Sequence, residues 1–206
     1  MRLSEMKISS RLALAFGLLL LLTVASAGLA VKSLGTLQND IDDVVRDNNV
    51  KVSHVTDMAE SIHVVARVMR SIILIDDKEL RERELAKLQK AREDYDRAWE
   101  AFVKMDTDDY GKEMHRKIIA ARDAGRPLNN KVLELANGGK KEEALKLLVA
   151  EANGATNKWQ DLLEEQMSIV EADSLTVAQK ASSDYVLARN VLIGAAAASL
   201  LLSVLT

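Results

Sequence analysis

Residues 12–31 read LALAFGLLLLLTVASAGLAV, an uncharged run of 20 residues bounded by Arg11 and Lys32. An α-helix rises about 1.5 Å per residue, so a run of this length crosses the roughly 30 Å hydrocarbon core of a bilayer. The preceding residues, 1–11, carry three basic side chains and one acidic side chain, and basic residues favour the cytoplasmic side of a span. The sequence therefore predicts a cytoplasmic segment over residues 1–11 and a transmembrane helix over residues 12–31.

A cleaved signal peptide is the competing interpretation of the same run. Ala25-Ser26-Ala27 resembles the small-residue site at which a signal peptide is removed. The apolar core of a signal peptide, however, spans roughly 7–15 residues, and the run here is longer. A membrane anchor therefore explains the segment better, and a mature N-terminus near Gly28 would identify a signal peptide instead.

The C-terminal residues 190–206 read NVLIGAAAASLLLSVLT, and no charged side chain follows Arg189. They predict a second transmembrane helix. Because the run is still apolar at Thr206, we expect the chain to be truncated there and to continue into the cytoplasm; a short C-terminal anchor is the alternative. Two spans with a cytoplasmic N-terminus place residues 33–188 in the periplasm of a bacterium, outside its inner membrane.

The segment between the spans has the composition of a helical domain, because the chain holds one Pro and nine Gly and is rich in good helix formers. Polar clusters break it at Asp76-Asp77, at residues 106–111 and at residues 137–139. These breaks predict four helices, over about 33–75, 78–105, 112–136 and 141–188. Short connections make the fold an all-α, up-down-up-down four-helix bundle flanked by two transmembrane helices.

Apolar residues recur at three- and four-residue steps along the first helix, which is the pattern of an amphipathic helix. The first and fourth helices lead into the membrane spans without a linker. Pro127 should kink the third helix or delay its start. Trp99 and Trp159 are expected to anchor the core.

The residues needed for catalysis or for metal binding are missing from the sequence. The chain has no Cys, its three His residues are scattered, and no phosphate-binding glycine loop occurs. Acidic residues alternate with Lys and Arg, as on a solvated helix face. The net charge of −3 is too small to indicate nucleic-acid binding. We therefore expect no enzyme, no cofactor, no metal and no nucleic-acid partner.

A row of basic side chains on the first helix is the leading candidate for a ligand site. His63, Arg67 and Arg70 stand at i, i+4 and i+7 and share one arc of the helix. Arginine presents a planar fork of donors that suits a carboxylate, so this arc predicts binding of a small anionic ligand. A solvated basic face with surface ion pairs is the alternative.

Two further features accompany this row. A second apolar stripe, formed by Val64, Val68 and Ile75, favours contact with a second copy of the chain and hence a homodimer. On the third helix, Arg122 and Arg126 project to one side together with His115, near Lys112 and Asn129. This second basic arc is the other candidate for ligand binding.

The opening residues 7–17, KISSRLALAFG, resemble the start of many methyl-accepting chemotaxis proteins. The resemblance continues through Gly28-Leu29 and residues 47–49, resumes near residues 142–144, and covers essentially the whole chain. Its motifs are loose. It implies the four-helix-bundle sensor of that family, which is a homodimer outside the cytoplasm and often binds organic acids or amino acids near the dimer contact.

This resemblance also implies a role for Arg67 and Arg70, because they lie where related receptors carry ligand-contacting arginines. The sequence is therefore interpreted as the sensor portion of a bacterial chemoreceptor, which binds a small carboxylate and signals through its second transmembrane helix. The alternatives are the sensor module of a histidine kinase or cyclic-dinucleotide enzyme, and a non-signalling helical scaffold in the membrane.

Overall fold

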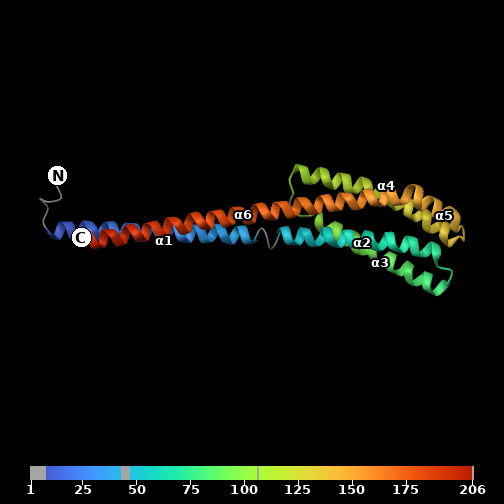
Figure 1. Cartoon of the computed structure of the whole chain (residues 1–206), viewed down its shortest axis with the longest axis horizontal. Coiled ribbons are helices and arrows are strands. Elements are labelled where there is room, and N and C mark those ends of the chain that lie inside the picture. The colour runs from blue at the N-terminus through green and yellow to red at the C-terminus, as the bar shows by residue number, and fades with distance from the viewer. Residues whose placement is uncertain (1–7, 43–46, 106, 206) are drawn as a thin grey trace. The chain divides into compact units, whose positions relative to one another are not determined.

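The computed structural model describes residues 8–42, 47–105 and 107–205, and these are almost entirely helical (Figure 1). The elements are α1 (Ile8–Asp42), α2 (Asn49–Leu74), α3 (Lys78–Phe102), α4 (Asp109–Asn137), α5 (Lys141–Leu147), the π-helical turn η3 (Leu148–Ala152) and α6 (Asn153–Leu205). They form two compact units, one of residues 47–173 and one of residues 1–46 with 174–206. The predicted all-α class is confirmed.

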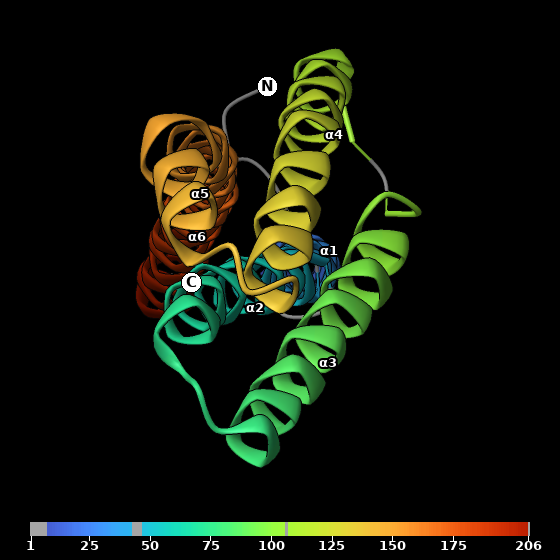
Figure 2. The same ribbon diagram turned by 90° about the vertical axis from the view of Figure 1, so that its right-hand side faces the viewer.

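The unit of residues 47–173 is a four-helix bundle. Viewed end-on, α2, α3, α4 and the stretch from α5 into α6 surround a common centre (Figure 2). All four contribute to one buried cluster that includes Val55, Tyr95, Met114 and Trp159. A second cluster contains Val68 and other apolar residues of the same bundle. The bundle is thus held by two apolar clusters, and both tryptophans lie in the first of them, as expected.

Two of the predicted breaks, at Asp76-Asp77 and at residues 137–139, are confirmed, and both lie at the same end of the bundle (Figure 1). Asp77 caps α3, because its carboxylate accepts a hydrogen bond from the Leu80 amide at 2.9 Å. Helix α4 ends at Asn137, and Gly139 follows with a φ of 76°, a conformation that glycine adopts without steric cost.

The start of the third bundle helix lies earlier than the predicted residue 112. Asp108 accepts a hydrogen bond from the Gly111 amide at 2.7 Å and caps α4, which begins at Asp109. Gly111 is therefore inside the first turn. Pro127 also lies within α4, so it does not delay the start of the helix. Asp106 lies outside the described residues.

The fourth bundle helix is interrupted by the π turn η3, which the sequence did not predict. Ala144, Leu148, Ala152 and Thr156 follow one another at steps of four residues, and all four are buried. An α-helix has 3.6 residues per turn, so a repeat of four drifts around it. The wider π turn reduces this drift and keeps the four side chains in the core.

The other unit contains α1 and the C-terminal part of α6. By length and composition, both ends of the chain supply helices able to cross a membrane. Their apolar side chains are largely exposed, as a lipid-facing surface requires. The sequence predicts that the first span continues into the first bundle helix without a linker. This prediction concerns residues 43–46, which lie outside the described part of the chain.

Candidate ligand-binding site

The predicted basic row of α2, His63, Arg67 and Arg70, is exposed along its whole length. The side-chain amide of Gln160 donates to Nδ1 of His63 at 2.9 Å, and this bond lies at the surface. Within the described residues, Arg67 and Arg70 show no hydrogen bond or ion pair. We call these three residues the outer row.

Arg67 lines an open groove between α2 and α3 with a volume of about 270 Å³. Lys87 and Lys90 add positive charge to the groove, and Glu60 and Asp94 add negative charge. The groove therefore has a mixed lining with one positive charge in excess. Arg70 is absent from this lining, so the structure does not bring the two arginines of the row together there.

The second apolar stripe of α2 is already covered within the chain. Val68 is 0% exposed and belongs to a cluster with Leu88 and Ala91 of α3, and Val64 packs against the same cluster. The stripe was interpreted as a contact with a second copy. Packing against α3 explains Val64 and Val68, while Ile75 is half-buried outside this cluster. The homodimer stays a prediction.

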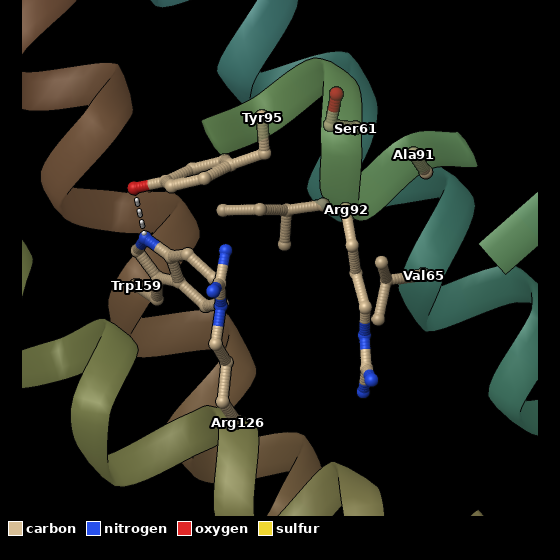
Figure 3. Close-up of a pocket in the computed structure, with 8 residues that line it drawn as sticks. Ser61, Val65, Ala91, Arg92, Tyr95, Arg126 and Trp159 are labelled. Carbon is tan, nitrogen blue, oxygen red and sulfur yellow. Dashed lines mark hydrogen bonds between the residues drawn. The ribbon is translucent and has the colours of Figure 1, made fainter. Parts of the chain in front are cut away.

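A small cavity is lined by residues of all four helices of the bundle (Figure 3). Its volume is about 10 Å³, close to the roughly 10–15 Å³ that holds one water molecule. We call it the arginine cavity. It is lined by Ser61, Ile62 and Val65 of α2, by Ala91, Arg92 and Tyr95 of α3, by Arg126 of α4 and by Trp159 of α6.

An aromatic pair closes one side of the arginine cavity. The indole N–H of Trp159 donates to the hydroxyl of Tyr95 at 3.0 Å, and the two rings meet edge to face with centroids 4.8 Å apart. Burial raises the pKa of Tyr95, so the phenol stays neutral. The guanidinium of Arg126 lies 5.5 Å from the Tyr95 ring centroid and 5.8 Å from that of Trp159, within the range of cation–π attraction.

The two arginines of the cavity have different partners. Arg126 forms a two-point ion pair with Asp96, while its Nε is buried and has no hydrogen-bond partner among the described residues. Arg92 donates to the side-chain oxygen of Asn130 at 2.6 Å. Burial and the nearby charge of Arg126 lower the pKa of Arg92. Two guanidiniums thus face one carboxylate, which leaves one positive charge in excess.

The arginine cavity and the outer groove share a wall. Ser61 and Ala91 line both of them, and both side chains are small. Ser61 and Ala91 therefore form a common boundary of the groove and the cavity. Arg67 of the outer row thus lines a groove that borders the arginine cavity.

The remaining predicted residues divide between two places. Arg126 reaches the cavity, whereas Arg122 is paired with Asp123 at 3.0 Å and does not line it. His115 packs against Trp99 and Phe102, with ring centroids 5.7 and 5.0 Å away. The third helix therefore contributes one residue, and not a whole arc, to the site.

Arg92 is the residue that the sequence analysis missed. It lies in a charged stretch of α3 that looks like a solvated face, and its burial depends on the helices packed around it. A hint was present, because Leu88, Ala91 and Tyr95 follow one another at steps of three and four residues, form a buried stripe and include the residue next to Arg92. Among the described residues, no group of three or more His, Cys, Asp or Glu could hold a metal ion.

One comparison with known proteins identifies the kind of module. A family described as a four-helix-bundle sensory module for signal transduction matches residues 5–185 of the chain. The matched module is sensory and not catalytic. No curated protein matches the chain. Two long apolar helices that flank a sensory bundle indicate a membrane protein with an extracytoplasmic domain.

Proposed function

Because the chain belongs to the four-helix-bundle sensory modules for signal transduction, we propose that it is the sensor portion of a bacterial chemoreceptor. Residues 33–188 lie in the periplasm, and the two apolar helices anchor them in the inner membrane. The bundle binds a small carboxylate and passes the signal to the cytoplasm. A homodimer is the assembly that the resemblance to chemoreceptors favours.

The observation that carries this proposal is the excess positive charge at the arginine cavity. In the described part of the chain, Asp96 pairs with Arg126 and also acts on Arg92, and the buried Nε of Arg126 has no partner. A carboxylate would balance the extra charge and accept hydrogen bonds from both guanidiniums. Such bonds are strong where the surroundings exclude water, as the Tyr95–Trp159 pair does on one side.

The size of the cavity determines how a ligand would bind. About 10 Å³ admits one oxygen atom, so the body of the ligand must lie outside or displace a neighbour. The groove beside Arg67 supplies that space on the far side of Ser61 and Ala91. Arg67 then attracts the anion, and the arginine cavity holds its carboxylate.

Binding at this site would change the packing of all four bundle helices at once. A ligand shifts an equilibrium only if it favours one arrangement, and admission of a carboxylate between α3 and α4 would do so. Packed helices shift by roughly 1–2 Å in such transitions. Helix α6 contains both Trp159 and the apolar residues 190–205, so a displacement of α6 is the proposed signal.

The binding step is tested by thermal unfolding of the full chain in nanodiscs. A panel of acetate, pyruvate, succinate, malate, citrate and benzoate provides the probes. At a concentration 100 times its Kd, a ligand of the folded state adds about 2.7 kcal/mol of stability, which is a measurable rise in Tm. A panel that leaves Tm unchanged would count against a carboxylate sensor of this type.

The orientation is tested by single cysteines at Asp108 and at Ser4. An impermeant thiol reagent added to cells with a permeabilised outer membrane should label the first and spare the second. The reverse pattern would place the bundle in the cytoplasm and overturn the proposal.

The signalling step is tested by fusing the chain to the cytoplasmic portion of a working chemoreceptor. Four glycines inserted after Ser183, inside α6, break the stiffness of the helix, since glycine costs about 1 kcal/mol per residue in a helix. Carboxylate affinity should survive, and the ligand-dependent response should be lost. A response of full amplitude would show that the signal does not travel along α6.

A further inference from the structure

A second cavity lies in the bundle near the connection between α3 and α4. Its volume is about 180 Å³, several times the space of one water molecule. Phe102, Tyr110 and Ile169 form apolar parts of its lining. The cavity is therefore large enough for a small organic molecule, and it shares no lining residue with the arginine cavity.

Gln166 marks this cavity as a candidate binding site. It lines the cavity, its residue is 4% exposed, and its side-chain oxygen is buried without a hydrogen-bond partner in the described part of the chain. Buried polar atoms nearly always have a partner, because an unpaired one loses its bonds to water without replacement. An acceptor in this position needs a donor from outside the protein.

Two carboxylates add further acceptors to the lining. Asp108 and Asp173 contribute carboxylates, and burial lowers the pKa of His115, so its ring is neutral near pH 7. The ammonium of Lys51 is occupied by Asp47 at 2.6 Å. The lining therefore has an excess of negative charge and of hydrogen-bond acceptors, the opposite of the arginine cavity.

We propose that this cavity binds a short aliphatic amine. One ammonium donates to the side-chain oxygen of Gln166 and to the carboxylate of Asp173, and the second ammonium of a diamine lies toward Asp108. The methylene chain packs on Phe102 and Ile169, and the aromatic rings add cation–π attraction. The bundle then holds two sites of opposite charge preference, one for a carboxylate and one for an amine.

The test is calorimetry of the full chain in nanodiscs with 1,4-diaminobutane as the probe, which carries one ammonium for each carboxylate. Butanoate and 1,4-butanediol have similar chains without the positive charge. We expect the diamine to bind and the other two not to compete with it. Gln166→Leu and Asp173→Asn should each weaken diamine binding by about tenfold, since each loses a hydrogen bond to a charged group.

Glu164→Gln is the matched control, because Glu164 is an exposed acid of α6 that does not line the cavity. Diamine affinity should stay unchanged in this variant. Asp173 is also exposed, so Asp173→Asn keeps the fold even if Gln166→Leu does not. The proposal is overturned if the diamine does not bind, if butanoate displaces it, or if Asp173→Asn weakens it no more than Glu164→Gln does.

Discussion

Arg67 extends from α2 into an open groove, whereas Arg126 extends from α4 toward the rings of Tyr95 and Trp159. Both arginines belong to basic rows with helical spacing, and the sequence alone favours the row of Arg67. The surroundings separate them. Water screens the charge of Arg67, while the charge of Arg126 lies beside aromatic rings and a second guanidinium. A basic row indicates where charge gathers, and only the packing around it decides whether a ligand is needed there.

The largest expected effect is on the unfolding free energy, when the side chain that contacts each basic row is removed. Trp159 contacts the cavity and the neighbouring Gln160 contacts His63 of the outer row. Trp159→Ala leaves a hole in the core and should cost about 3–5 kcal/mol of unfolding free energy. Gln160→Ala removes one surface hydrogen bond and should stay within about 0.5 kcal/mol. Urea unfolding followed by circular dichroism measures both, and equal losses would contradict the distinction between the two rows.

A smaller effect is expected from the carboxylate that partly neutralises the cavity. Asp96→Asn removes the negative charge beside Arg92 and Arg126, so the affinity for a carboxylate ligand should rise. The unfolding free energy should fall by no more than about 1 kcal/mol, because the ion pair is half exposed. Asp94→Asn is the control, since Asp94 lies in the outer groove and pairs with Arg97 at 2.9 Å. Calorimetry should find no gain in affinity for the control. A gain in Asp94→Asn alone would place the anion in the groove.

The smallest effect is a dependence of stability on pH. Burial lowers the pKa of His115 below its ordinary value, so the unfolded chain takes up a proton at a higher pH than the folded chain. Stability should therefore decrease as the pH falls from about 7.5 to about 5.5, the range around the ordinary histidine pKa. Thermal unfolding across this range should show the decrease in the wild type and in His63→Gln, and a weaker decrease in His115→Asn. An unchanged slope in His115→Asn would exclude His115 as its source.

Most of the fold could be predicted from local signals. Asp77 caps a helix and Gly139 ends one, and both effects depend on a few neighbouring residues. The predicted start of α4 was too late, because the side chain of Asp108 accepts a hydrogen bond from the Gly111 amide and the helix therefore begins at Asp109. The π turn was missed because it depends on which side chains the other helices bury. In the sequence, its signal is the spacing of Ala144, Leu148, Ala152 and Thr156 at steps of four residues.

The residues of the candidate site were predictable by type but not by position. Arg126 was expected, whereas Arg92 becomes visible only when α3 and α4 are packed together. The second stripe of α2 depends on packing in the same way, because Val68 lies against α3. Gln166 carries no sequence signal at all, since a lone glutamine on a helix is ordinary. In each case, the environment of the residue depends on contacts with a distant segment of the chain, which the sequence alone does not show.

The most direct test of the central claim compares Arg126→Ala with the double variant Arg67→Ala/Arg70→Ala. The probe is whichever carboxylate of the panel raises Tm most in the full chain, and calorimetry in nanodiscs measures its affinity. Loss of a charge-assisted bond in a partly desolvated site costs on the order of 2–5 kcal/mol, so Arg126→Ala should weaken binding at least 30-fold, roughly. The double variant should weaken it by less than about tenfold, because Arg67 only attracts the anion. Circular dichroism confirms that both variants are folded. Intact binding in Arg126→Ala with binding lost in the double variant would contradict the account and place the ligand on the outer row of α2.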